Sequence, residues 1–445
     1  MGEGTNPAKS GGLGALGRGA AANLVGFGVF TLCQFGALSL LGRLAGPDGV
    51  GLYGLALGIA TPVFLFTNMS LRPAFATDLG GEWPFASYRV IRIASALAGL
   101  GISVGVAVFV RADLGFVVLV AIMAVAKFGE ALSDLGYGVF QAVEKVGLIG
   151  RSLGLRGVVG LVLLAGGAGA GLLIDDAPGD SVLLGLAALG LCAGWWLVWA
   201  GHDRTRAHLI VSGELKAQRP AILDPARGTG ALLWTVLPLG LAIFLTSLQM
   251  MGPRFVVEAV FSLRMLGFFT AVMALTSLGV QAVNMMGQVL VPRMAAALQA
   301  GRRVPFVAYV GALAGLGAAG GAAYIVIGQI WGGPVLALLF GPEFAEGEHL
   351  FAVLALAGAV RFIAEALRVA LVSARRFRTR LVFESFAIAV LIAAVTQLVQ
   401  GYDIIEIAYA LLVAELVSGL VLVLIIAGLV IGATQGTNRS GAVGD

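Results

Sequence analysis

Charged side chains inside long apolar segments are the residues of this sequence best suited to chemistry. Lys127, Glu130 and Asp134 are spaced i, i+3 and i+7, so all three fall on one helical face. A second group with alternating sign consists of Arg361, Glu365 and Arg368. If these segments cross a bilayer, a central charge costs about 2.5–3.5 kcal/mol and needs a partner or a wet cavity. Each face therefore either lines a cavity and contacts its substrate, or neutralises itself and locks helices together.

The composition requires a membrane. The chain has 445 residues, of which 59% are hydrophobic and 12% charged, and its mean hydropathy is +0.97. Soluble proteins carry about 25% charged residues. The chain has no Gly-Lys dipeptide, which excludes a P-loop ATPase. The three histidines, His202, His208 and His349, fall in polar connections, so no transmembrane metal site and no cofactor are expected.

The apolar residues form about twelve blocks, each near the roughly 20 residues that span the hydrocarbon. The blocks are 17–41, 50–71, 91–110, 114–133, 147–174, 181–201, 231–251, 265–290, 306–331, 350–373, 381–400 and 405–432. If the N-terminus is cytoplasmic, twenty of the 28 Lys and Arg residues lie in inside connections and four in outside connections. This bias predicts an even number of spans with both termini in the cytoplasm.

The sequence also contains an internal repeat. Four pairs of segments match in order, with offsets that grow from 216 to 234: 51–56 with 267–272, 71–73 with 290–293, 84–88 with 305–309, and 127–132 with 361–367. The alternative is chance similarity among helices rich in Gly, Ala and Leu. A true repeat of six spans gives two copies of the same orientation, related by an axis along the membrane normal. The predicted domains are therefore a lobe at 1–201, a cytoplasmic linker at 202–230, a lobe at 231–432 and a cytoplasmic tail at 433–445.

Five motifs carry a family resemblance: residues 39–54 (SLLGRLAGPDGVGLYG), 249–255 (QMMGPRF), 267–269 (GFF), 292–293 (PR) and 340–344 (FGPEF). Together they resemble the polysaccharide-export flippases, including the O-antigen and exopolysaccharide flippases, of the multidrug/oligosaccharidyl-lipid/polysaccharide (MOP) superfamily. The lipid II flippases are relatives with two further spans, which this sequence lacks.

The resemblance implies an all-α polytopic protein of the bacterial inner membrane, with about twelve transmembrane helices in two parallel six-helix lobes around a central cavity. It implies a monomer that translocates undecaprenyl-diphosphate-linked oligosaccharide by alternating access, without covalent chemistry, nucleic acid or a cofactor. Polysaccharide polymerase and assembly proteins are its expected partners. Two alternatives stay open: a multidrug, cation-antiporting exporter of the same superfamily, and a membrane enzyme of polysaccharide assembly.

Arginines are the candidates for holding the diphosphate, because guanidinium forms bidentate hydrogen bonds with phosphate oxygens. Arg43 and Arg264 occupy corresponding places in the two halves, on the side that is otherwise poor in cations. They suit a substrate or gating role, or else interfacial anchoring. Arg254 is a similar candidate, with helix capping as its alternative. Arg72 and Arg293 lie beside prolines at cytoplasmic ends, where they either receive the diphosphate or anchor the helices.

Several further features have a more structural interpretation. Glu384 and Glu415 lie within late spans and either carry a coupling proton, since burial raises a carboxyl pKa, or bond helix to helix. Glycines at helical spacing predict a packing face at Gly150, Gly154, Gly157 and Gly160. Trp195, Trp196 and Trp199 predict an aromatic belt at the end of the sixth span.

Overall fold

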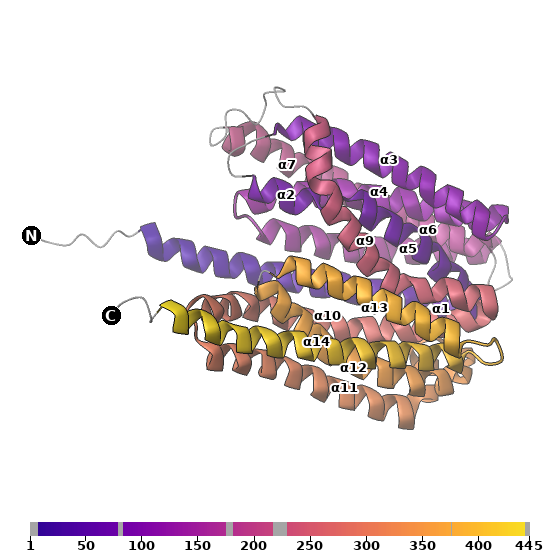
Figure 1. The fold of residues 1–445 in the computed structure, drawn as a ribbon. Coiled ribbons are helices and arrows are strands. Elements are labelled where there is room, and N and C mark those ends of the chain that lie inside the picture. Colours follow the sequence, from indigo (N-terminus) through magenta and orange to yellow (C-terminus); the bar gives the residue numbers. More distant parts are fainter. Residues whose placement is uncertain (1–7, 79–82, 175–180, 217–228, 375, 441–445) are drawn as a thin grey trace, which may run out of the picture. The chain divides into compact units, whose positions relative to one another are not determined.

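The computed structural model describes residues 8–78, 83–174, 181–216, 229–374 and 376–440. Helices make up the fold, and no strand occurs in these ranges. Figure 1 shows the long helices. They are α1 (Ala8–Thr67), α3 (Phe85–Val110), α4 (Leu114–Ala142), α5 (Gly147–Ile174), α6 (Ser181–Val198), α9 (Thr229–Val260), α10 (Leu263–Gln299), α11 (Arg303–Phe340), α12 (Glu348–Ser373), α13 (Phe377–Leu398) and α14 (Ile405–Ser440).

The helices agree with the predicted apolar blocks. In the part of the chain that is described, ten helices are long and apolar enough to cross a membrane. One of them, Gly17–Ala76, comprises most of α1 and its 60 residues contain about 90 Å of helix at 1.5 Å per residue, enough for more than one crossing of the hydrocarbon. The first predicted block lies in α1, the second runs from α1 to the first residue of α2 (Leu71–Thr77), and 231–251 lies in α9. Each predicted block is therefore largely helical, apart from the turn at 68–70 and a few block ends, and the all-α membrane fold is confirmed.

A break at Gly46 divides α1. Gly46 has φ 62° and ψ −169°, a conformation open to glycine and strained for other residues. Pro47 follows directly and has no backbone N–H to continue the helix. A Cβ atom added at Gly51 would collide with the carbonyl oxygen of Leu263, and one at Gly267 with that of Pro47. The glycines bring residues 46–51 against the start of α10.

The chain forms two compact units. The first comprises residues 1–45 and 52–247, and the second residues 46–51 and 248–445. In the first unit α3 packs on α4, and α6 packs on both α4 and α5. In the second, α12 packs on α10, α11 and α14. The units divide within α9, because Leu232 and Val236 near its start pack in one hydrophobic cluster with Phe75 and Tyr88 of the first unit.

The segment predicted as a cytoplasmic linker is partly helical. After α6 the chain continues through the π-helix η1 (Trp199–Arg204), α7 (Thr205–Ile210) and the π-helix η2 (Val211–Leu215). Residues 217–228 of the predicted linker lie outside the described residues. The apolar positions Ala207, Ile210 and Val211 are buried and extend the core of the first unit.

Glycine faces hold α5 to its neighbours. A Cβ at Gly150 would collide with the backbone of Ala22 in α1, and one at Gly157 would lie 2.9 Å from Cα of Phe30. A Cβ at Gly160 would lie 3.0 Å from Nε1 of Trp195 in α6. Small residues allow this close approach, so the predicted packing face is confirmed at Gly150, Gly157 and Gly160. A Cβ at Gly154 would make only an ordinary contact, 3.8 Å from Cα of Gly26.

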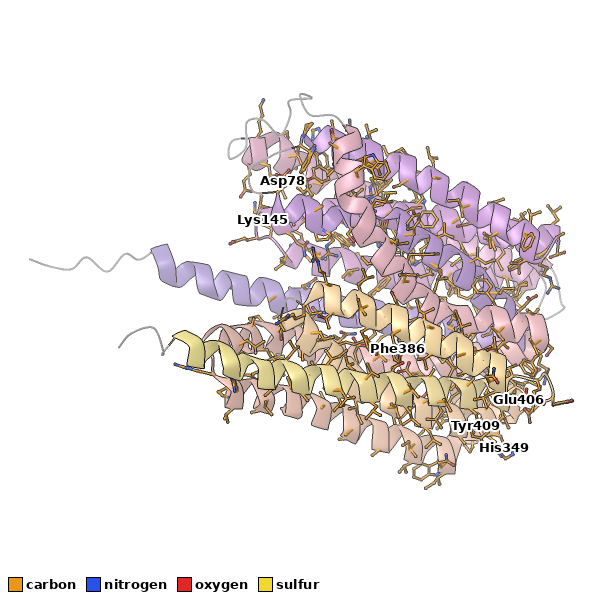
Figure 2. All side chains as sticks on the ribbon, viewed as in Figure 1. Asp78, Lys145, His349, Phe386, Glu406 and Tyr409 are labelled. Carbon is orange, nitrogen blue, oxygen red and sulfur yellow. The ribbon has the colours of Figure 1, made fainter. Side chains whose placement is uncertain are left out.

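The outer surfaces of the helices suit lipid. Phe109 is 92% exposed and Leu173 is 91% exposed, which would be unfavourable in water and is favourable against acyl chains. Polar connections gather at the helix ends. Figure 2 shows His349 and Glu406 at one end of the second unit. This alternation is the one expected of a multi-pass membrane protein.

Candidate functional site

A cluster around Asp134 connects three elements of the first unit. Asp134 in α4 accepts a hydrogen bond from the Arg92 guanidinium of α3 at 3.0 Å and lies 3.6 Å from that of Arg72 in α2 (Leu71–Thr77). Arg92 also donates to Asn68, and Arg72 donates to Gln141 at 3.1 Å. In the described part of the chain, two cations share this one carboxylate. Its partners come from different elements, which favours helix locking for Asp134 and Arg72.

The backbone places Arg72 and Arg92 in this cluster. Met69 and Ser70 have φ values of 46° and 50°, and this left-handed turn starts α2 so that Arg72 reaches Asp134. By sequence, Arg92 is counted among the inside cations, because it is the second residue of the block 91–110 and so lies at the cytoplasmic end of that block. Helix α3 begins six residues earlier, at Phe85, so Arg92 lies in its second turn and is 0% exposed. Sequence reasoning missed this residue.

Lys127 and Glu130 form a pair along α4. The Lys127 ammonium donates to Glu130 at 2.8 Å and lies 5.4 Å from the centre of the Trp195 ring. Trp195 is 1% exposed, so the prediction that it belongs to an aromatic belt is wrong. Its ring packs in the core between two cations, Lys127 and Arg156. Of the three charges predicted to share one helical face, Lys127 and Glu130 neutralise each other, while Asp134 pairs with Arg92 of α3.

A second buried network lies where α6 runs into η1. Asp203 is 1% exposed; it accepts a hydrogen bond from Ser152 at 2.9 Å and lies 3.7 Å from the Arg156 guanidinium. Nδ1 of His202 lies 2.8 Å from the other carboxylate oxygen. The expectation that His202 lies in a polar connection is wrong, because the helix continues past residue 201 and buries the side chain. The position of Arg156 inside an apolar block was the signal available in the sequence.

The charges of the second unit also pair across helices. Arg361 in α12 donates to Glu415 in α14. Arg368 in α12 lies 3.6 Å from Glu365 and 3.6 Å from Glu384 in α13. Both acids proposed for proton coupling, Glu384 and Glu415, are therefore buried beside guanidinium groups. Such pairing favours the alternative of helix-to-helix bonding for these two carboxylates.

Arg254 differs from these arginines. It lies in α9, is 9% exposed, and its guanidinium contacts the sulfur of Met251 at 2.6 Å. Among the described residues no carboxylate lies within ion-pair distance of it, and its Nε has no hydrogen-bond partner. Gln249, one turn earlier, is buried with its side-chain oxygen unpaired and lines a small cavity together with Arg361 and Glu415. A buried guanidinium with unused donors can bind an anion.

The other predicted arginines are at the surface. Arg264, at the start of α10, pairs with Glu346 at 2.9 Å and Glu343 at 3.4 Å, and is 36% exposed. Arg43 is exposed in the turn before Gly46, and Arg293 is exposed beside Pro292 in α10. Arg43 belongs to the first unit and Arg264 to the second. The acidic neighbours of Arg264 favour anchoring of the helix end for that residue.

Comparison with known proteins supports the fold. No family model matches the chain. The "Capsular polysaccharide biosynthesis protein CapF" of Staphylococcus aureus is 26% identical over 329 residues, which are 73% of this chain and 77% of that protein. The lipid II flippase MurJ, in an inward closed conformation, has a TM-score of 0.67 at 8% identity, over 91% of this chain and 88% of its own. An outward-facing MATE multidrug resistance transporter of the MOP superfamily has a TM-score of 0.65 at 14% identity, over 95% and 96% of the two chains. The chain has the fold of the MOP-superfamily transporters.

The fold determines where the charged groups lie relative to the membrane-spanning helices. Proteins of this fold include transporters and flippases, and the charges described here lie on membrane-spanning helices rather than in an exposed loop. Most of them, in both units, hold one helix to another. Among the described residues, Arg254 is a buried arginine with no carboxylate within ion-pair distance, whereas Arg92, Arg156 and Arg368 also have unpaired guanidinium nitrogens but lie beside carboxylates.

Proposed function

We propose that this protein is a flippase that moves undecaprenyl-diphosphate-linked oligosaccharides across the bacterial inner membrane, with both termini in the cytoplasm. The observation that carries the proposal is the relative involved in capsular polysaccharide biosynthesis, which matches 73% of the chain. The MOP-type fold supplies the transporter architecture. Polysaccharide polymerase and assembly proteins are the expected partners.

Arg254 supports an anionic substrate. A diphosphate carries at least two negative charges, and guanidinium is the side chain that matches phosphate geometry best. Burying a cation without a carboxylate partner is costly. A substrate phosphate that accepts from the free Nε and the remaining N–H groups would offset this cost. We propose Arg254 as a diphosphate-binding residue.

Alternating access fits the separate cores of the two units. The first unit has its own hydrophobic cluster around Phe75, Tyr88 and Phe140, and the second has one around Phe306 and Phe362. Each unit is also fastened by its own buried ion pairs, including those of Asp134 and Glu415. Units built in this way can move as bodies while their internal contacts persist.

The test uses a strain from which the gene is deleted and which has no redundant flippase. We expect loss of surface polysaccharide and accumulation of lipid-linked repeat units on the cytoplasmic side. Wild-type protein should restore both. Arg254→Gln should lower the initial transport rate about 10- to 100-fold, since hydrogen bonds to charged groups contribute about 1.5–3 kcal/mol. Arg111→Gln, an exposed arginine at the end of α3, is the matched control and should transport normally.

Two results would contradict the proposal. Normal surface polysaccharide in the deletion strain would remove the flippase function. Unchanged polysaccharide together with new sensitivity to cationic drugs would identify a multidrug exporter instead. Such an exporter needs an anionic group for its substrate, and in the cavity that Gln249 lines the carboxylate of Glu415 is already paired with Arg361.

A further inference from the structure

The first unit contains a cavity of about 420 Å³ that the transport proposal does not use. Its walls come from α3, from α4 and from the helical segment 199–216 that extends α6. The interior is largely apolar and includes Phe85, Leu135, Trp199 and Val211. All of these residues belong to the first unit.

Basic residues surround the mouth of this cavity. Arg204, His208 and Lys216 follow the segment 199–216 at multiples of four residues, and all three are exposed. Arg89, in the second turn of α3, is exposed on another wall. Within the described ranges, no carboxylate lies within ion-pair distance of Arg89, Arg204 or Lys216. Arg204 lies 5.6 Å from the centre of the Trp199 ring, next to the apolar part of the lining.

The acidic residue in the lining does not oppose an anion. Asp203 contributes to the wall, but its carboxylate is 1% exposed and is engaged by Ser152, His202 and Arg156. The Arg156 guanidinium compensates its charge. The field at the mouth is consequently set by the basic residues.

We propose that this cavity binds a phospholipid with a net negative headgroup, such as phosphatidylglycerol. The phosphate lies among Arg89, Arg204 and Lys216, and the glycerol and first acyl carbons lie over Phe85 and Trp199. Basic pockets between transmembrane helices at the membrane surface are suited to anionic headgroups. Arg89 near the start of α3 and Lys216 at the end of the helical segment place the phosphate at headgroup depth. The apolar interior favours a lipid over a soluble anion.

The proposal is tested with the purified full-length protein, delipidated in mild detergent and titrated with lipid in native mass spectrometry. Phosphatidylglycerol should bind more tightly than phosphatidylcholine of the same chain length. The double variant Arg89→Gln with Arg204→Gln should weaken phosphatidylglycerol binding about 25-fold, since each basic residue near an anionic membrane surface contributes about fivefold. Ala86→Trp, which fills the cavity mouth and keeps every charge, should also weaken binding.

Matched controls separate this site from general surface charge. Arg111→Gln changes the other end of α3, and Arg206→Gln changes a residue of the same helical segment that lines a different cavity. Neither should change phosphatidylglycerol binding more than twofold. Thermal unfolding with and without lipid checks that each variant is folded, and bound lipid should raise the melting temperature of the wild type.

Three outcomes would overturn the assignment. These are equal binding of phosphatidylcholine and phosphatidylglycerol, unchanged binding in both the double variant and Ala86→Trp, and competition by glycerol 3-phosphate at the affinity of the lipid, which would identify a soluble anion. No glycolipid is present in the titration. Failure here therefore leaves the flippase proposal intact, and loss of transport in Arg254→Gln does not affect this result.

Discussion

Replacing Asp134 by asparagine should destabilise the first unit strongly. The substitution keeps the shape of the side chain and removes the charge that neutralises Arg92. Arg92 is 0% exposed, so its guanidinium would remain in the protein interior with Asn68 as its partner. Arg72 would lose the same carboxylate but is 29% exposed and keeps its hydrogen bond to Gln141.

The burial of the two arginines sets the size of the effect. Breaking a buried ion pair from one side costs about 3–5 kcal/mol, because the other charge is left uncompensated. Asp134 itself is 25% exposed, which places the expected loss near the lower limit of that range. Arg72→Gln should cost about 1 kcal/mol or less, as partly exposed pairs usually do. Removing both charges with Arg92→Leu and Asp134→Leu should recover much of the loss.

Equilibrium unfolding in mixed detergent micelles, followed by circular dichroism, measures these differences. The wild type, Arg92→Leu, Asp134→Leu and the double leucine variant form a double-mutant cycle that isolates the coupling of the two residues. An unfolding free energy for Asp134→Asn within about 1 kcal/mol of the wild type would refute the reasoning. So would a double leucine variant less stable than Asp134→Asn, because burial of the unpaired guanidinium would then not be the cause.

Three further predictions concern helix contacts, and the same unfolding assay measures each of them. Gly150→Leu should destabilise the protein by about 1–3 kcal/mol through overpacking against α1, while Gly166→Leu, which meets nothing within 4 Å, should be near neutral; equal losses would contradict the packing face. Arg264→Ala should cost less than about 1 kcal/mol, with a dependence on salt, because its two ion pairs are exposed. Glu415→Ala should lower the free energy of unfolding much more than Arg264→Ala, because it leaves the buried guanidinium of Arg361 without its carboxylate partner. Similar losses in the two variants would show that burial does not determine the contribution of these ion pairs.

The helices could be predicted from the sequence because the bilayer imposes a strict rule. A segment that crosses lipid must be apolar, about 20 residues long and hydrogen-bonded within itself, so length and composition suffice. The ends of helices do not obey this rule. Outside the hydrocarbon, polar residues can be helical too, which is why helical structure continues after α6 through η1, which contains His202, into a segment predicted as a linker.

The partners of the intramembrane charges could not be predicted, because spacing along one helix reveals the face and not the neighbour. Lys127 and Glu130 form the ion pair that their spacing suggests. Asp134 lies on the same face but forms its ion pair with Arg92 of another helix. Arg361 has Glu365 one turn away and bonds Glu415 instead. These contacts depend on tertiary packing, and a single sequence does not contain that information in readable form.

Most intramembrane arginines are paired with carboxylates, which leaves few candidates for a residue that binds the substrate. A transport site must bind its ligand reversibly, and a guanidinium already held by a buried carboxylate would have to break that bond first, at a cost of about 3–5 kcal/mol. Arg92, Arg156, Arg361 and Arg368 are held in this way. Arg254 is not, because its nearest polar contact is the Met251 sulfur, a weak acceptor. A phosphate can bind Arg254 without displacing any described carboxylate, so among the buried arginines it is the one on which transport of an anionic glycolipid should depend most.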